Sequence, residues 1–240
     1  MNKNILITGA SRGLGYEMAK FFLKSGYNLY VIDKIDNKNF FSVFHDGNIK
    51  YFQIDLANTD SIKDFLDKYI KNNIIKVNVL ILNAAPRIFK RFEDFHIDEL
   101  EKLTSASFLS SLIILNSVYK QMKNDNFGRI FIISSKSGLK GYSKGSVYCS
   151  YKSAWITFHE AFSREINKNY NISINTICPD SFSTNLNVKI KGYQKIIDRI
   201  LTIIENNMEI KKSEIHFPSR LITKIEFLKI FILKLIKTIK

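Results

Sequence analysis

The sequence predicts an α/β fold of the Rossmann type, in which helices cover both faces of a doubly wound parallel sheet. Short apolar runs alternate with longer segments whose apolar residues recur at helical spacing. Such an alternation implies right-handed crossovers between parallel strands. At 240 residues, with three prolines and no Gly/Ser-rich linker, the chain is expected to form one domain over residues 1–240.

The expected elements follow one another regularly. Strands are expected near residues 3–8, 27–32, 49–54, 77–82, 129–134 and 172–177, where apolar residues run together. Helices are expected near residues 13–25, 59–71, 97–123, 147–169, 190–207 and 221–238. Loops rich in Asn and Lys connect them, and residues 185–240 are expected to hold the helices of a substrate loop and a C-terminal helix.

The turn after the first strand carries glycines in the spacing Gly9-x-x-x-Gly13-x-Gly15. Glycines at a strand-to-helix turn let the backbone approach a diphosphate, and the helix N-terminus offers free N–H groups to it. Ligands of such sheets bind at the carboxyl ends of the strands, near the point where the strand order reverses. The glycine turn therefore predicts a dinucleotide site there.

A second motif predicts acid/base chemistry. Tyr148 and Lys152 stand four residues apart on an expected helix, so both side chains project from the same face. A cation beside a phenol favours the phenolate, and this is expected to lower the pKa of Tyr148 toward neutrality. Ser135 follows an apolar strand thirteen residues upstream of Tyr148.

With these motifs in the same order, the chain resembles the short-chain dehydrogenase/reductase family from about Asn4 to Leu186. The motifs that carry the resemblance are Thr8-Gly-x-x-x-Gly-x-Gly15, Asp55-Leu56, Asn83-Ala-Ala85, Ser135, Tyr148 with Lys152, and Asn175-Thr-Ile-Cys-Pro-Asp-Ser-Phe-Ser-Thr184.

The resemblance implies hydride transfer between a nicotinamide cofactor and a carbonyl or alcohol carbon. Tyr148 would exchange the proton of the substrate oxygen, and Ser135 would hydrogen-bond that oxygen. Lys152 would lower the pKa of Tyr148 and hold the nicotinamide ribose. Ser107 stands where the family usually has an asparagine that supports a relay water.

The resemblance also implies which residues contact the cofactor. The set is Gly9, Ser11, Arg12, Gly13, Leu14, Gly15, Asp33, Asp55, Leu56, Asn83, Ala84, Tyr148, Lys152, Pro179 and Thr184. Asp33 ends the second strand, where a carboxylate can accept from both adenosine ribose hydroxyls and repel a 2′-phosphate. Arg12 and Lys34 could instead pair with that phosphate, so NAD is favoured and NADP is the alternative.

Four departures from the family pattern stand out. Ser107 replaces the asparagine, Ala85 and Asp180 each replace a glycine, and the chain ends after the helix at 221–238. From that ending we expect the sheet to lack the family's usual seventh strand.

The net charge of +14 raises the question of partners. Lysines are spread through nearly every element and no nucleic-acid motif accompanies them, so nucleic-acid binding is not expected. Basic residues after two strands, at Arg87, Lys90 and Arg91 and at Lys136, Lys140 and Lys144, leave two interpretations: solvated loop charge, or recognition of an acidic substrate.

Other features suggest a cytoplasmic protein without a metal. Two separated cysteines, scattered histidines and the lack of a secretory signal support this expectation. Lysines interrupt the apolar stripe of the helix at 221–238, so membrane contact by this helix is not expected and a role as interface or core cover is favoured.

Three functions remain open at this stage. The first is an NAD(P)-dependent oxidoreductase acting on a small carbonyl or alcohol, the second a ketoreductase for 3-oxoacyl thioesters on an acyl carrier, and the third a catalytically inactive nucleotide-binding scaffold or sensor. A homodimer through the helices at 97–123 and 147–169 is expected, with no tetramer built on a seventh strand.

Overall fold

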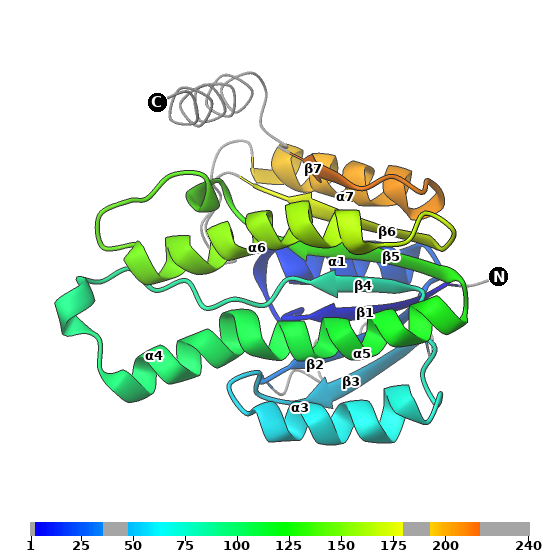
Figure 1. Ribbon diagram of the computed structural model, residues 1–240, viewed down its shortest axis with the longest axis horizontal. Coiled ribbons are helices and arrows are strands. Elements are labelled where there is room, and N and C mark those ends of the chain that lie inside the picture. Colours follow the sequence, from blue (N-terminus) through cyan, green and yellow to red (C-terminus); the bar gives the residue numbers. More distant parts are fainter. Residues whose placement is uncertain (1–2, 36–47, 180–192, 217–240) are drawn as a thin grey trace.

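The computed structural model describes residues 3–35, 48–179 and 193–216, and its centre is a seven-stranded parallel sheet (Figure 1). The strand order is β3-β2-β1-β4-β5-β6-β7. The strands are β1 (Asn4–Thr8), β2 (Asn28–Asp33), β3 (Ile49–Gln53), β4 (Val79–Leu82), β5 (Phe127–Ile133), β6 (Asn171–Ile177) and β7 (Glu214–His216). The order reverses between β1 and β4, which places the switch point above the glycine turn.

The expectation of a missing seventh strand was wrong. β7 pairs in parallel with β6, and Asn175, Thr176 and Ile177 lie in register with Glu214, Ile215 and His216. The strand precedes the segment at 221–238, whereas the expectation assumed that it would have to follow that segment. The expectation of no tetramer rested on the absence of this strand. The presence of β7 removes the reason for that expectation.

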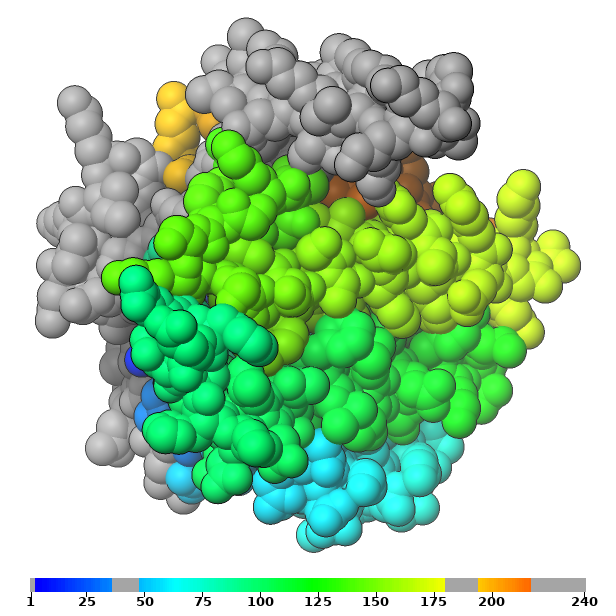
Figure 2. Space-filling view, turned by 60° about the vertical axis from the view of Figure 1, so that its left-hand side comes forward, coloured from blue at the N-terminus to red at the C-terminus, as the bar shows by residue number. Residues whose placement is uncertain are grey.

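Helices flank the sheet on both faces. They are α1 (Gly13–Lys24), α3 (Thr59–Phe65), α4 (Ile97–Thr104), α5 (Ser110–Asn124), α6 (Ser146–Glu165) and α7 (Tyr193–Glu209). A π-helical segment at Ser105–Leu109 joins α4 to α5, and another at Leu66–Lys71 continues α3. The helices α4, α5 and α6 lie together on one face of the molecule (Figure 2). The helix expected at 221–238 lies outside the described residues.

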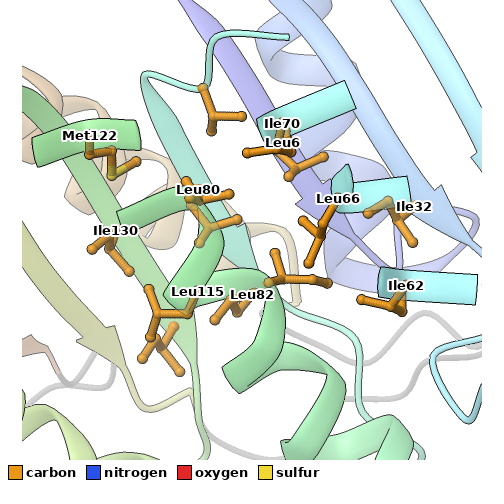
Figure 3. Packing of buried hydrophobic residues seen from close by; sticks show 14 of the residues in the cluster. Leu6, Ile32, Ile62, Leu66, Ile70, Leu80, Leu82, Leu115, Met122 and Ile130 are labelled. Atoms are coloured by element: carbon orange, nitrogen blue, oxygen red, sulfur yellow. The ribbon is translucent and has the colours of Figure 1, made fainter. Parts of the chain in front are cut away.

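Alternating strand residues build two separate cores. On one face, Leu6, Leu80 and Ile130 pack against α3, α5 and α6 (Figure 3). On the other face, Ile5, Ile7, Val79, Ile81 and Phe131 pack against α1 and α7. Such burial on both faces explains why the strands are continuous apolar runs rather than alternating ones.

Arg129 is a charged residue inside β5, and it is 1% exposed. Its guanidinium donates to the carbonyl oxygens of Met208 at 3.1 Å and Asn171 at 2.8 Å. Carbonyls at a helix C-terminus lack partners within the helix, so this cation satisfies the end of α7. Glu209 beside it pairs with Lys3.

Candidate active site

The glycine turn brings the backbone of β1, α1 and the β4 end into close contact. Gly9 has φ +72°, and a Cβ there would lie 2.8 Å from Cα of Ala84. A Cβ on Gly15 would lie 2.0 Å from the carbonyl oxygen of Gly9. A Cβ at either position would collide with these neighbouring atoms, so the close packing of the turn requires glycine there.

Thr8 and Asn83 hold this turn in place. The Asn83 amide donates to the carbonyl oxygens of Thr8 at 3.1 Å and Gly9 at 2.7 Å. The Thr8 hydroxyl accepts from the backbone N–H groups of Asn83 and Ala84 at 3.1 and 3.2 Å. The Asn83 amide thus fixes the turn, a role that the sequence did not indicate.

Asp33 is also bound into the turn. Its Oδ2 accepts from the Ser11 N–H at 2.9 Å, and its Oδ1 accepts from the Ile35 N–H at 3.1 Å. The carboxylate is 7% exposed and lines the cavity together with Arg12 and Lys34. All three side chains that bear on cofactor choice therefore meet at one place.

The N-terminus of α1 faces the same cavity. Arg12 precedes the helix without a side-chain cap, and the first turn holds no acidic residue. Uncapped N–H groups and the positive end of the helix dipole favour an anion here. Gly13 and Leu14 of this turn line the cavity.

Ser135, Tyr148 and Lys152 come together at the ends of β5 and α6. All three line the same cavity. The Lys152 ammonium is 5% exposed and donates to the Ile133 carbonyl at 2.7 Å. Ser135 Oγ accepts from the Ser137 N–H at 3.1 Å. Residues predicted from widely separated motifs thus form one site.

The protonation of Tyr148 differs from the expectation. Burial raises the pKa of its phenol above the ordinary value, although a hydrogen bond with Ser135 and the charge of Arg87 each lower it. The Lys152 Nζ lies 5.8 Å from the centre of the Tyr148 ring. Burial lowers the pKa of Lys152 itself to about 8.

Ser107 lies near the site without lining the cavity. It sits in the π-helical segment between α4 and α5, and its carbonyl accepts from the Trp155 indole at 3.2 Å. Its hydroxyl is buried, and it has no hydrogen-bond partner among the described residues. Ser107 and the Tyr148 site are therefore not joined by a hydrogen bond in the described structure.

The remaining predicted residues divide into two groups. Asp55, Leu56, Ala84 and Pro179 line the cavity. Thr184, like Asp180, lies outside the described residues.

Phe89 was not singled out in the sequence, whereas Arg87 was one of the basic residues considered for an acidic substrate. The Phe89 ring lies 5.3 Å from the Tyr148 ring, centre to centre. Arg87 lines the cavity and stands over Phe89, with its Cζ 5.3 Å from that ring centre. An aromatic residue in the loop after β4 was the available signal, but only the fold shows that this loop faces α6.

The family model of the short chain dehydrogenases matches residues 3–194. The chain belongs to the short-chain dehydrogenase/reductase family. This family comprises NAD(P)-dependent oxidoreductases, and its motifs here fall on the residues that meet in the cavity.

Individual relatives within the short-chain dehydrogenase/reductase family agree with this assignment. An uncharacterized oxidoreductase of Saccharomyces cerevisiae is 30% identical over 203 residues, which are 82% of this chain but 65% of that protein. A 3-oxoacyl-acyl-carrier-protein reductase of Buchnera aphidicola is 28% identical over 198 residues, 81% of this chain and 80% of the relative.

Among solved structures, a 4-hydroxyisoleucine dehydrogenase complexed with NADH and succinate has the same fold. Its TM-score is 0.74 at 24% identity, over 90% of this chain and 98% of that one. In the described ranges, every helix is too short or too polar to cross a membrane.

Proposed function

We propose that the protein is an NAD-dependent oxidoreductase that interconverts a carbonyl compound and its alcohol. The observation that supports this best is the meeting of Ser135, Tyr148 and Lys152 at one end of a cavity that has Asp33 at the other. A structural role alone does not require a buried lysine beside a half-buried tyrosine at the mouth of a dinucleotide site.

The residues present fit a dinucleotide. The glycine turn lines the cavity with Gly9, Gly13 and Gly15, and the uncapped start of α1 suits a diphosphate. Asp33 would accept from the adenosine ribose, while Asp55, Leu56, Asn83 and Ala84 would border the adenine and the second ribose. Pro179 and Thr184 would lie beside the nicotinamide. When bound, the nicotinamide supplies or accepts the hydride.

The chain's own residues would manage the proton. Tyr148, whose raised pKa keeps the phenol protonated at neutral pH, would donate to the substrate oxygen while Ser135 binds the same oxygen. Lys152 would contact the ribose and steady the charge that develops on Tyr148. For Ser107 we propose a positioning role, in which its carbonyl binds the Trp155 indole and so holds α6 against the segment between α4 and α5.

The test is the substitution Tyr148→Phe. It removes the proton donor and keeps the ring packed against Phe89, so turnover should fall by roughly 10²-fold or more. Binding of NADH, measured by calorimetry, should stay within about twofold. Wild-type rates in this variant would disprove the role of Tyr148. Wild-type protein that binds NADH but turns over no member of a carbonyl panel would instead favour the scaffold.

A second candidate is a ketoreductase for acyl-carrier-linked 3-oxoacyl thioesters. It is favoured by the Buchnera relative of that name and by the net charge of +14, which would attract an acidic carrier. Turnover of acetoacetyl-carrier well above that of free acetoacetyl thioester, and its loss at high salt, would favour this candidate.

A further inference from the structure

The two ends of the cavity carry different charges. At the adenosine end, the cations Arg12 and Lys34 are balanced by Asp33 and Asp55. At the catalytic end, after β4 and β5, the charged lining residues are Arg87 and Lys152, and no carboxylate lies among the described lining residues there. The catalytic end therefore favours an anion beyond what the dinucleotide cradle itself requires.

The other basic residues around the mouth do not serve the cavity. Lys90 and Arg91 lie in the same loop as Arg87 but do not line the cavity. Lys136, Lys140 and Lys144 do not line it either. The choice between solvated loop charge and substrate recognition therefore depends on Arg87.

Arg87 is supported at a defined place. Its guanidinium rests on Phe89, and Phe89 rests in turn on the Tyr148 ring, each with a separation of 5.3 Å. Behind Phe89 the chain has Gly145, where a Cβ would lie 2.9 Å from the Phe89 ring. The guanidinium thus stands one aromatic ring away from the proton donor, and its charge is felt by the Tyr148 phenol.

We infer that the substrate carries a carboxylate, and that Arg87 binds this carboxylate while the carbonyl oxygen faces Ser135 and Tyr148. The substrate class is then an oxo acid and the corresponding hydroxy acid. A planar guanidinium suits this task because it can donate two parallel hydrogen bonds to one carboxylate. The inference rests on the proposed function, since Tyr148 is taken as the proton donor.

The experiment compares oxo acids with their methyl esters. Pyruvate, acetoacetate and 4-oxopentanoate place the carboxylate at increasing distance from the ketone, and each ester keeps the ketone but loses the charge. With NADH, wild type should reduce at least one acid with a higher kcat/KM than its ester. Arg87→Met should raise KM for that acid by about 10- to 100-fold, as expected for a lost charged hydrogen bond, and should change KM for the ester far less, so that the preference for the acid is lost.

Three variants sharpen the comparison. Arg87→Lys keeps the positive charge but loses the planar guanidinium with its two parallel donors. It should therefore retain only part of the acid preference that Arg87→Met loses. Arg91→Met removes an exposed arginine of the same loop and should change nothing. The Kd for NADH should be equal in wild type and Arg87→Met, because a loss of cofactor affinity would mean that Arg87 holds the cofactor, which would overturn the inference.

Binding separates this inference from the proposed function. Quenching of NADH fluorescence reports whether the three acids bind the enzyme–NADH complex, and Tyr148→Phe should bind them as wild type does without turnover. Esters reduced as well as acids, with no effect of Arg87→Met, would overturn the carboxylate site and leave the function standing. Arg87-dependent acid binding with no turnover of any carbonyl would keep the site and reject the function. Preference for dihydroxyacetone phosphate over all acids, or no acid binding at all, would also overturn the inference.

Discussion

Lys152 shows how burial decides the chemistry of single residues in this protein. Its ammonium is almost fully buried and donates to the Ile133 carbonyl, and its pKa falls to about 8. Tyr148 is shifted in the opposite direction, because burial disfavours the charged form of either group. At neutral pH the pair therefore holds a protonated phenol beside a mostly protonated amine, which suits proton donation to a carbonyl oxygen.

Asp33 is the residue expected to determine cofactor choice. Its carboxylate should repel a 2′-phosphate, so wild type should bind NAD(H) more tightly than NADP(H). Asp33→Ala should narrow or reverse this preference. The ratio of the two Kd values should shift by about tenfold or more in favour of NADP(H), and each tenfold corresponds to roughly 1.4 kcal/mol of binding free energy. Calorimetric titration of both cofactors measures this.

Asp33→Asn is the matched control. An asparagine oxygen can still accept from the Ser11 N–H, which Asp33 holds at 2.9 Å, so the turn should stay intact while the charge is lost. Tighter binding of NADP(H) by wild type would contradict the assignment of NAD(H) as the cofactor. Arg12 and Lys34 would then be the residues that determine cofactor choice.

At the scale of elements, one histidine joins α6 to β6 and a second joins β7 to β6. His159 of α6 meets Thr176 of β6 at 3.1 Å, and His216 of β7 meets Asn175 of β6 at 2.8 Å. Burial and the neighbouring His216 lower the pKa of His159 to about 4. The sequence showed only scattered histidines, whereas the fold makes two of them neighbours.

This packing predicts acid sensitivity. Since the folded-state pKa of His159 lies below its ordinary value of 6.5, the unfolded chain takes up the proton first as the pH falls. The contribution of neutral His159 to the free energy of unfolding is fully present above pH 6.5 and is lost progressively as the pH falls toward 4. Urea unfolding should show on the order of 2 kcal/mol less stability at pH 5 than at pH 7 from this group.

His159→Gln should flatten that dependence, whereas His96→Gln, at an exposed position, should leave it unchanged. An unaltered pH dependence in His159→Gln would assign the acid sensitivity to other groups.

The elements also show what a sequence can predict here. Six strands and the helices at their flanks were expected close to their observed bounds, because apolar runs and helical spacing are local signals. β7 was missed because Glu214–His216 is three residues long, half-buried, and preceded by Lys211 and Lys212. The contact of Phe89 with Tyr148 was missed for another reason, since it joins residues far apart in the chain and only the fold brings them together.

At the scale of the whole molecule, the face made by α4, α5 and α6 is the expected dimer surface (Figure 2). Leu115 of α5 and Trp155 of α6 are buried in the protein's own core at 2% and 3% exposure. Phe108, Leu112 and Phe158 are only partly buried, and Leu109 remains 43% exposed. These four residues are the apolar groups that a partner could cover.

We therefore predict a dimer through this face. Light scattering at micromolar concentration should give twice the monomer mass, and Leu109→Glu should shift the protein toward monomer because a buried unpaired charge opposes association. Ile210→Glu adds the same charge at an exposed apolar position after α7 and should leave the dimer intact. A monomeric wild type, or equal effects of both variants, would contradict this interface.

The buried guanidinium of Arg129 has a consequence for how the chain is made. Its acceptor at Met208 lies 79 residues further along, so synthesis at 5–20 residues per second separates the two by roughly 4–16 s. Throughout that interval the emerging β5 carries a cation in a strand that is otherwise apolar, with no helix end to receive it. The nascent protein thus cannot close this side of its sheet until α7 leaves the ribosome, and it is in this interval that a chaperone would have most to protect.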